Sequence, residues 1–265
     1  MPHASETFSV PSKYIPIVAE VIAITTILAC VVMNRLGNKD IGGLYWPYLS
    51  DAAKNPPEAA IFAFGLTITC MLLVMCVVIN YGYIKKNIES RGEHTELGKK
   101  GTKRNKFALW CGLLSAPFLG LLAAFDTART PALHIAFVLG FFPLVSAFLF
   151  VNTSTYALVL QHAHATRHAR LDVVQKSVRR KRMCCIALLV FVTLYLPVGM
   201  SIVTSWVDYS TEPGLHSFRA VCQHLSILCL LIYFGSFYYD FGDLRLRIMQ
   251  EDPPKPHAAT FNKTS

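Results

Sequence analysis

Residues Asn55–Ile84 read NPPEAAIFAFGLTITCMLLVMCVVINYGYI, and this stretch indicates the class of fold. From Ala59 to Ile84 it contains no Asp, Glu, Lys or Arg, whereas about 20 apolar residues are enough for a helix to cross a bilayer. The chain of 265 residues is 53% apolar and 15% charged, and soluble domains usually contain about 25% charged residues. The sequence therefore predicts an integral membrane protein rather than a soluble domain with a large core.

The start of this stretch has the layout of a helix N-terminus. Asn55 can act as the cap, Pro56 suits the first helical position, and the Glu58 carboxylate favours the positive end of the helix dipole. Two interpretations remain open at this point. In the first, the polar start only caps a membrane helix. In the second, Asp51 and Glu58 line a polar mouth where a lipid head group or a partner docks.

Six apolar segments of spanning length lie along the chain, and they leave little room for a separate soluble domain. Because residues Met1–Lys13 lack the basic start and cleavage site of a secretory signal, the first segment is kept as a span. We predict an all-α, six-helix transmembrane bundle over residues 1–242 and a disordered tail over 243–265. The predicted spans are Ile15–Met33, Ala59–Asn80, Phe107–Phe125, Ala132–Leu158, Met183–Trp206 and Phe218–Tyr239.

The positive charge is concentrated in two connections that a six-span topology places on one side, together with both termini. Ile84–Lys106 contains eight of the 25 lysines and arginines, and Gln161–Arg182 contains seven. The positive-inside rule then predicts that both termini are cytosolic. The run Arg179, Arg180, Lys181 and Arg182 is predicted to meet anionic cytoplasmic lipid, at about 1 kcal/mol per basic side chain. Nucleic-acid binding is not predicted, because no recognisable module accompanies the charge.

All eight cysteines fall inside or at the edge of apolar segments, so no disulfide framework is indicated. Most are expected to be small packing residues. Cys184 and Cys185, directly after the basic run, are candidates for palmitoylation at the cytosolic edge. No Cys/His spacing resembles a zinc site, and neither a metal nor a cofactor is predicted.

Glu20 is the one acidic residue inside the first span, at a depth of roughly 8 Å at helical rise. Acidic residues inside a membrane are rare and often functional, because a charge there is costly. A plain hydrogen bond between helices explains Glu20 equally well. Its candidate partners at the same depth are Asn152 and Tyr156 on the fourth span.

A second set of polar residues is predicted at the opposite, non-cytosolic ends of the helices. If these side chains converge, they form a site for lipid or a partner; otherwise each is an ordinary residue at a helix end. The set consists of Asp51, Pro57, Glu58, Asp126, His134, Gln223 and His224.

Three stretches resemble the Frag/DRAM/Sfk superfamily of six-span membrane proteins. The first is Pro47-Tyr48-Leu49-Ser50-Asp51 followed by Pro56-Pro57-Glu58, and the second runs from Phe125 to His134 with Pro143 nine residues later. The third is the aromatic run Ile232–Gly242, IYFGSFYYDFG. The chain departs from many relatives at Ala53, where they have Gly, and at Gln223-His224, where they have Glu-Trp.

The resemblance implies a multi-pass membrane protein without an established catalytic mechanism. One branch is associated with lysosomes and autophagy, and another acts at the plasma membrane in recruiting a phosphatidylinositol 4-kinase complex. The favoured function is therefore a non-enzymatic organiser of lipid or phosphoinositide-linked machinery, with membrane lipids such as phosphoinositides or sterol and a cytosolic protein as partners. The alternatives are a factor that remodels GPI-anchor lipids in the Golgi or ER, with His134 and Glu58 or Asp126 as acid–base pair, and a channel or transporter.

Overall fold

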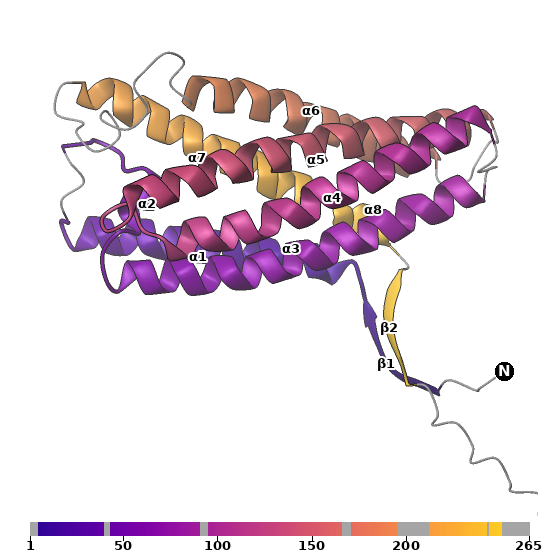
Figure 1. Ribbon diagram of the computed structural model, residues 1–265, viewed down its shortest axis with the longest axis horizontal. Helices are drawn as coiled ribbons and strands as arrows, with labels where there is room; N and C mark the ends of the chain where they lie inside the picture. Colours follow the sequence, from indigo (N-terminus) through magenta and orange to yellow (C-terminus); the bar gives the residue numbers. More distant parts are fainter. Residues whose placement is uncertain are drawn as a thin grey trace, which may run out of the picture.

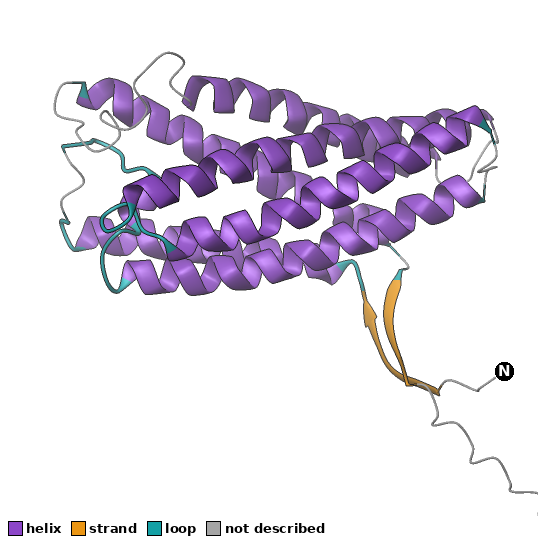
Figure 2. Ribbon diagram, in the orientation of Figure 1, coloured by secondary structure: helices purple, strands orange, loops and turns teal. Residues whose placement is uncertain are grey.

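The structure, a computed structural model, describes residues 5–39, 43–90, 95–165, 171–195, 212–242 and 244–250. Within these residues long helices run side by side, and two strands extend from one end of the bundle (Figures 1 and 2). We call the end that carries the strands the terminal end and the opposite end the distal end. The elements are β1 (Ser5–Pro11), α1 (Tyr14–Leu36), α2 (Leu49–Ala52), α3 (Glu58–Glu89), α4 (Glu96–Ala124), α5 (Pro131–Ala165), α6 (Leu171–Tyr195), α7 (Pro213–Gly235), α8 (Phe237–Phe241) and β2 (Arg245–Gln250).

Five helical stretches of the described chain are long and apolar enough to cross a membrane: α1, α3, α4, Pro131–Leu160 of α5, and Pro213–Phe241 over α7 and α8. Large apolar side chains also cover the outside of the bundle, with Phe64 71%, Trp110 61% and Ile186 63% exposed. Such side chains are stable outside when lipid rather than water surrounds them. The helical, integral membrane character and five of the predicted spans are thus supported.

The fifth predicted span, Met183–Trp206, is described only as far as Tyr195, where the described part of α6 ends. Helix α6 runs along α5 and α7 (Figure 1), and α7 begins again at the distal end. The first helix begins, and the last helix ends, at the end of the bundle that carries the strands. The chain between these two points would therefore cross the membrane an even number of times. Six crossings and cytosolic termini stay predictions, since residues 196–211 lie outside the described chain.

The start of α3 differs from the sequence-based expectation. The helix begins at Glu58 with Pro57 at the N-cap, and no side chain caps it. Asn55 contributes its backbone instead, because its carbonyl accepts a hydrogen bond from the Ala59 amide at 2.9 Å. The Glu58 side chain turns toward a lysine of the preceding loop.

Glycines bring neighbouring helices into close contact. A Cβ atom at Gly65 of α3 would collide with Thr26 of α1, and one at Gly112 of α4 would lie 2.8 Å from Val77 Cγ1 of α3. Such contacts between small and larger residues are typical of helix packing in membranes, where backbones approach closely. They fix α1, α3 and α4 as one tightly packed wall.

The two ends of the chain pair as an antiparallel ribbon, which contradicts part of the prediction of a disordered tail. Strand β1 pairs with β2 in a register that joins Ser5 to Gln250 and Pro11 to Arg245. The Ser12 amide continues the ladder by donating to the Leu244 carbonyl at 2.9 Å. The prediction of disorder is therefore wrong for Arg245–Gln250, and residues 251–265 lie outside the described chain.

Candidate functional site

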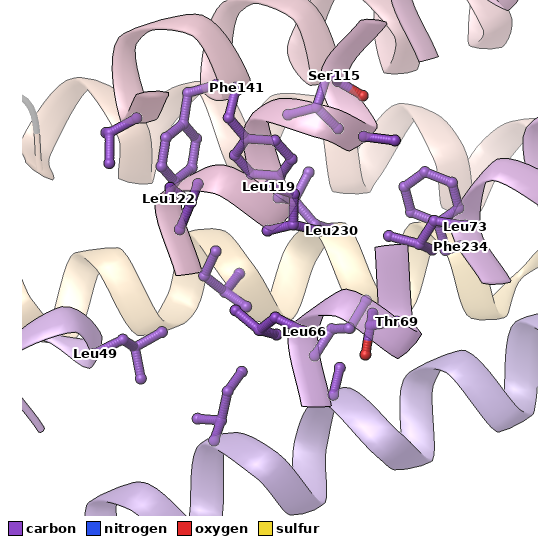
Figure 3. A pocket seen from close by; sticks show the side chains of 18 of the residues that line it. Leu49, Leu66, Thr69, Leu73, Ser115, Leu119, Leu122, Phe141, Leu230 and Phe234 are labelled. Carbon is purple, nitrogen blue, oxygen red and sulfur yellow. The ribbon is translucent and has the colours of Figure 1, made fainter. Parts of the chain in front are cut away.

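An apolar cavity occupies the distal half of the bundle. It lies among α1, α3, α4, α5 and α7, and its empty space amounts to about 990 Å³, including the part that is continuous with the exterior. Leu66, Leu119, Leu122, Phe141 and Leu230 extend into it from these helices (Figure 3). Pockets for small molecules in proteins are mostly apolar. The cavity therefore has the chemistry of a site for a lipid-like molecule.

The cavity is about as deep as one leaflet of a bilayer. On α5 its lining runs from His134 to Val145, and on α7 from Gln223 to Phe234. Each of these segments rises about 16 Å at 1.5 Å per residue. Half of a hydrocarbon core of about 30 Å is about 15 Å. A lipid from one leaflet, aligned with the helices, could therefore place its hydrocarbon part in this space.

Helix α2 closes the distal end of the cavity, and hydrogen bonds hold it there. The Leu49 amide donates to Gln223 Oε1 of α7 at 2.9 Å, and Gln223 Nε2 donates to the Tyr195 hydroxyl at 3.2 Å. The loop before α2 is tied to the same helix, because the Tyr45 amide donates to Ser217 Oγ at 2.9 Å. The lid is thus anchored to α7 at two separate points.

The predicted distal polar set converges only in part. Gln223 and His134 line the cavity together with Ser50, and the His134 imidazole donates from Nδ1 to the Phe125 carbonyl at 2.8 Å. Asp51, which is buried beside them on α2, accepts a hydrogen bond from Thr127 Oγ1 at 3.4 Å. These four residues form a polar cap at the distal end of the apolar space, and Asp51 is its one acidic member.

The remaining members of that set have structural partners outside the cavity. Asp126 accepts a hydrogen bond from the Arg129 amide at 2.6 Å in the turn between α4 and α5. His224 donates to the Ala220 carbonyl at 2.7 Å and packs edge-on against Trp46. Pro57 is the N-cap residue of α3. For these three residues the structure supports the interpretation as ordinary residues at helix ends.

Glu58 is almost fully buried and pairs with Lys39 of the loop after α1. Lys39 Nζ lies 2.5 Å from Glu58 Oε2 and 3.0 Å from the Pro56 carbonyl oxygen. The carboxylate therefore neutralises a lysine and fastens the loop to α3. It does not line the cavity as the sequence had suggested.

A buried polar network joins α3, α5 and α7 at the terminal end. Asn80 Nδ2 donates to Asn152 Oδ1 at 2.8 Å, and the Tyr156 hydroxyl donates to Asn80 Oδ1 at 2.8 Å. Asn152 Nδ2 in turn donates to the Tyr233 hydroxyl at 2.9 Å. Asn152 and Tyr156, the candidate partners of Glu20, thus form hydrogen bonds within this network. The Glu20 carboxylate instead lies against Gly235 of α7.

Next to this network is a buried ion pair that the sequence did not reveal. Lys181 Nζ of α6 lies 2.5 Å from Asp240 Oδ2 of α8, and both side chains are almost completely buried. Lys181 also donates to Ser177 Oγ at 2.8 Å and to Ser236 Oγ at 2.9 Å. The ring of Tyr156 is 4.4 Å from the ammonium group. A carboxylate, two hydroxyl groups and an aromatic ring therefore take the place of water around the lysine ammonium group.

The basic run Arg179–Arg182 thus divides into an exposed part and a buried part. Arg179, Arg180 and Arg182 are exposed, whereas Lys181 points into the bundle and forms the ion pair. The Arg180 guanidinium lies 4.4 Å from the centre of the exposed Tyr239 ring. The signal that could have placed Lys181 inside is its helical spacing from Ser177 and Cys185, which share its face.

The two candidate palmitoylation sites are buried. Cys184 is 8% and Cys185 3% exposed, and Cys185 Sγ lies 3.4 Å from Thr153 Oγ1 of α5. In this conformation neither thiol faces the lipid, so both act as packing residues between helices.

Comparison with known proteins gives a family and several related proteins. The Frag1/DRAM/Sfk1/Cwh43P N-terminal domain matches residues 11–244. DNA damage-regulated autophagy modulator protein 1 of Mus musculus is 24% identical over 212 residues, covering 78% of this chain and 82% of the relative. Modulator of macroautophagy TMEM150B of Danio rerio is 22% identical over 196 residues, covering 74% and 71%. No solved structure matches. Since the family's domain covers most of the chain, the protein belongs to the Frag1/DRAM/Sfk1/Cwh43P family of membrane proteins.

Proposed function

We propose that the protein is a non-enzymatic lipid-binding membrane protein that acts in autophagy-related membranes. The observation that carries the proposal is the leaflet-deep apolar cavity beneath α2. The mouse and zebrafish relatives are named as autophagy modulators, which supports the cellular setting. We propose an endolysosomal membrane on the same basis, with the plasma membrane as the alternative.

An orientation with the terminal end in the cytosol agrees with the placement of charge. The two most basic parts of the chain are residues 84–106, at the end of α3 and the start of α4, and residues 161–182, at the end of α5 and the start of α6. Both lie where these helices meet at the terminal end. Basic residues in short connections favour the cytosolic side. The exposed arginines of α6 would then meet anionic lipid or a cytosolic protein, such as a phosphatidylinositol 4-kinase complex.

The GPI-remodelling alternative loses its acid–base pair in this arrangement. It requires the Glu58 or Asp126 carboxylate to act with His134. Glu58 is paired with Lys39, and Asp126 is engaged by the Arg129 amide. His134 is held by the Phe125 carbonyl. The cavity is therefore better suited to holding a lipid than to hydrolysing one.

Filling the cavity tests the proposal. Leu119→Trp adds side-chain volume where Leu119 extends into the empty space (Figure 3). We expect the lipid that co-purifies with the protein, measured by mass spectrometry, to fall by about tenfold or more, or about 1.4 kcal/mol. The matched control is Leu114→Trp on the same helix, because Leu114 is 50% exposed on the lipid-facing side.

In the control, the amount of bound lipid should equal that of the unmodified protein. Equal lipid in the Leu119 variant, with both variants monodisperse, would contradict a binding role for the cavity. A loss in both variants would show that the lipid adheres to the outer surface of the bundle.

The exposed arginines of α6 provide a separate prediction. Changing Arg179, Arg180 and Arg182 to Gln while keeping Lys181 should remove three surface charges without disturbing the buried ion pair. At about 1 kcal/mol per basic residue, co-purifying phosphatidylinositol 4-phosphate should fall by about tenfold or more. Unchanged recovery of this lipid, at unchanged thermal stability, would limit the arginines to a role in topology.

A further inference from the structure

The seam between α1 and α7 is the place where the cavity lining reaches the surface of the bundle. Ile27 of α1 and Ile227 and Leu231 of α7 line the cavity and are also partly exposed. On the facing wall, Leu119, Val138 and other lining residues of α4 and α5 are buried. The empty space therefore adjoins the exterior along α1 and α7.

Tight contacts close three other seams that border the cavity. Gly65 of α3 is pressed against Thr26 of α1, Gly112 of α4 against Val77 of α3, and Gly140 of α5 against Phe118 of α4. The corresponding contact between α1 and α7 is that of Glu20 with Gly235, toward the terminal end and below the cavity. Contacts between α1 and α7 are also sparse compared with those between α1 and α3. The α1–α7 seam is thus less tightly packed than the α1–α3, α3–α4 and α4–α5 seams of the described chain.

The distal end offers no comparable entrance in the described part of the chain. The α2 lid is fixed to α7 through Leu49 and Gln223, and the preceding loop is fixed to α3 through Lys39 and Glu58. A lipid that entered from the aqueous side would have to break these bonds. Entry from the membrane through the α1–α7 seam requires only the displacement of apolar side chains.

The lining also restricts the head group. None of the described residues that line the cavity is Asp, Glu, Lys or Arg, and its polar side chains belong to Ser50, Thr69, Ser115, His134 and Gln223. Thr69 and Ser115 already donate to carbonyls of their own helices. An ionised head group enclosed here would lose its hydration without gaining a counter-charge, which is strongly unfavourable. An uncharged hydroxyl head group avoids this cost, and it would lie at the polar end of the cavity, near Ser50, His134 and Gln223.

We infer that the cavity takes up a whole, uncharged hydroxyl lipid from the distal leaflet of the membrane, and that this lipid enters between α1 and α7. This inference rests on the proposed lipid-binding function and specifies the class of ligand and the route. The lipid would lie along the helices, with its hydroxyl group beneath α2 and its hydrocarbon part toward the bilayer centre.

Photolabelling of the purified protein in lipid nanodiscs tests both parts. Three probes are used: photoreactive cholesterol, photoreactive diacylglycerol and photoreactive phosphatidylserine. We expect at least one uncharged probe to label peptides that contain Leu119 or Phe141, with competition by its unlabelled form. The phosphatidylserine probe should label only lipid-facing positions. Labelling of the cavity peptides by phosphatidylserine, at the level of the uncharged probes, would overturn the assignment of ligand class.

The route is tested by narrowing the seam. Ile27→Trp and Ile227→Trp should slow labelling of the cavity by about tenfold. Because both side chains also line the cavity, the rate of each variant is measured relative to its own final level of labelling. The controls are Leu28→Trp and Leu228→Trp, since these neighbouring residues are 56% and 44% exposed on the outer face. Equal rates for seam and control variants would rule out this route.

The two proposals fail in different ways. If no probe labels the cavity of the unmodified protein and Leu119→Trp changes nothing, the lipid-binding function itself is wrong. If an uncharged probe labels the cavity but the seam variants label at the normal rate, binding stands and only the route is wrong.

Discussion

Replacing Lys181 with methionine is expected to destabilise the bundle by about 3–5 kcal/mol, because it leaves the Asp240 carboxylate buried without its cation. Lys181 Nζ lies 2.5 Å from Asp240 Oδ2, and the two side chains are 0% and 2% exposed. The same substitution also removes a donor from Ser177 and Ser236. For a chain of this size, the melting temperature in detergent should fall on the order of 10 °C.

Two further variants distinguish the buried pair from a general effect of removing charge. Arg182→Met, one residue further along α6, removes an exposed charge and should leave the melting temperature nearly unchanged. The double variant Lys181→Met with Asp240→Leu should recover most of the loss, since apolar groups of similar size can replace a buried pair without penalty. A melting temperature that falls equally in Lys181→Met and Arg182→Met, or that is not recovered in the double variant, would contradict the role of the pair.

The ion pair also shows where inference from the sequence ends. Arg179, Arg180 and Arg182 lie at the surface as the charged run suggested, but the helical turn of α6 directs Lys181 inward. Its partner, Asp240, is on α8, within the aromatic run Ile232–Gly242. Sequence spacing within α6 could have indicated the buried face, but no local pattern links it to a residue in α8.

The positions of the helices were predictable because uninterrupted apolar runs have a simple physical cause in the thickness of the bilayer. The cavity was not predictable, because its lining consists of the same Leu, Val and Phe residues that fill a packed core. Whether such side chains meet or leave a gap depends on the angles and distances between helices. Of the distal polar residues that the sequence suggested as candidates, only Asp51, His134 and Gln223 gather at the cavity cap.

The paired terminal strands were missed for a different reason. Arg245-Leu246-Arg247-Ile248 alternates polar and apolar residues, which is the pattern of a strand. A strand of this length needs a partner, and its partner lies at the other end of the chain. Short polar termini are disordered in most proteins unless such a partner is present.

Gly65→Ala is expected to destabilise the bundle by about 1–3 kcal/mol, although Ala generally favours a helix over Gly by about 1 kcal/mol. The added Cβ atom would lie 2.7 Å from Thr26 Cγ2 and 2.8 Å from Thr26 Cβ, well inside normal contact. Thr26 cannot easily move away, because it is buried and its branched side chain has restricted rotamers in a helix. Helix α1 must therefore shift away from α3, and thermal unfolding in detergent measures the cost.

The same helix supplies the control that makes this result specific to the α1–α3 contact. A Cβ atom at Gly82 meets nothing within 4 Å, so Gly82→Ala should be neutral or stabilising by up to about 1 kcal/mol. Combining Gly65→Ala with Thr26→Gly should cost less than the sum of the single changes, because the second removes the atoms that collide with the first. Strict additivity would mean that the two helices are not in close contact. Because α1 borders both this closed seam and the seam with α7, displacing α1 from α3 should also speed labelling of the cavity by the uncharged probe.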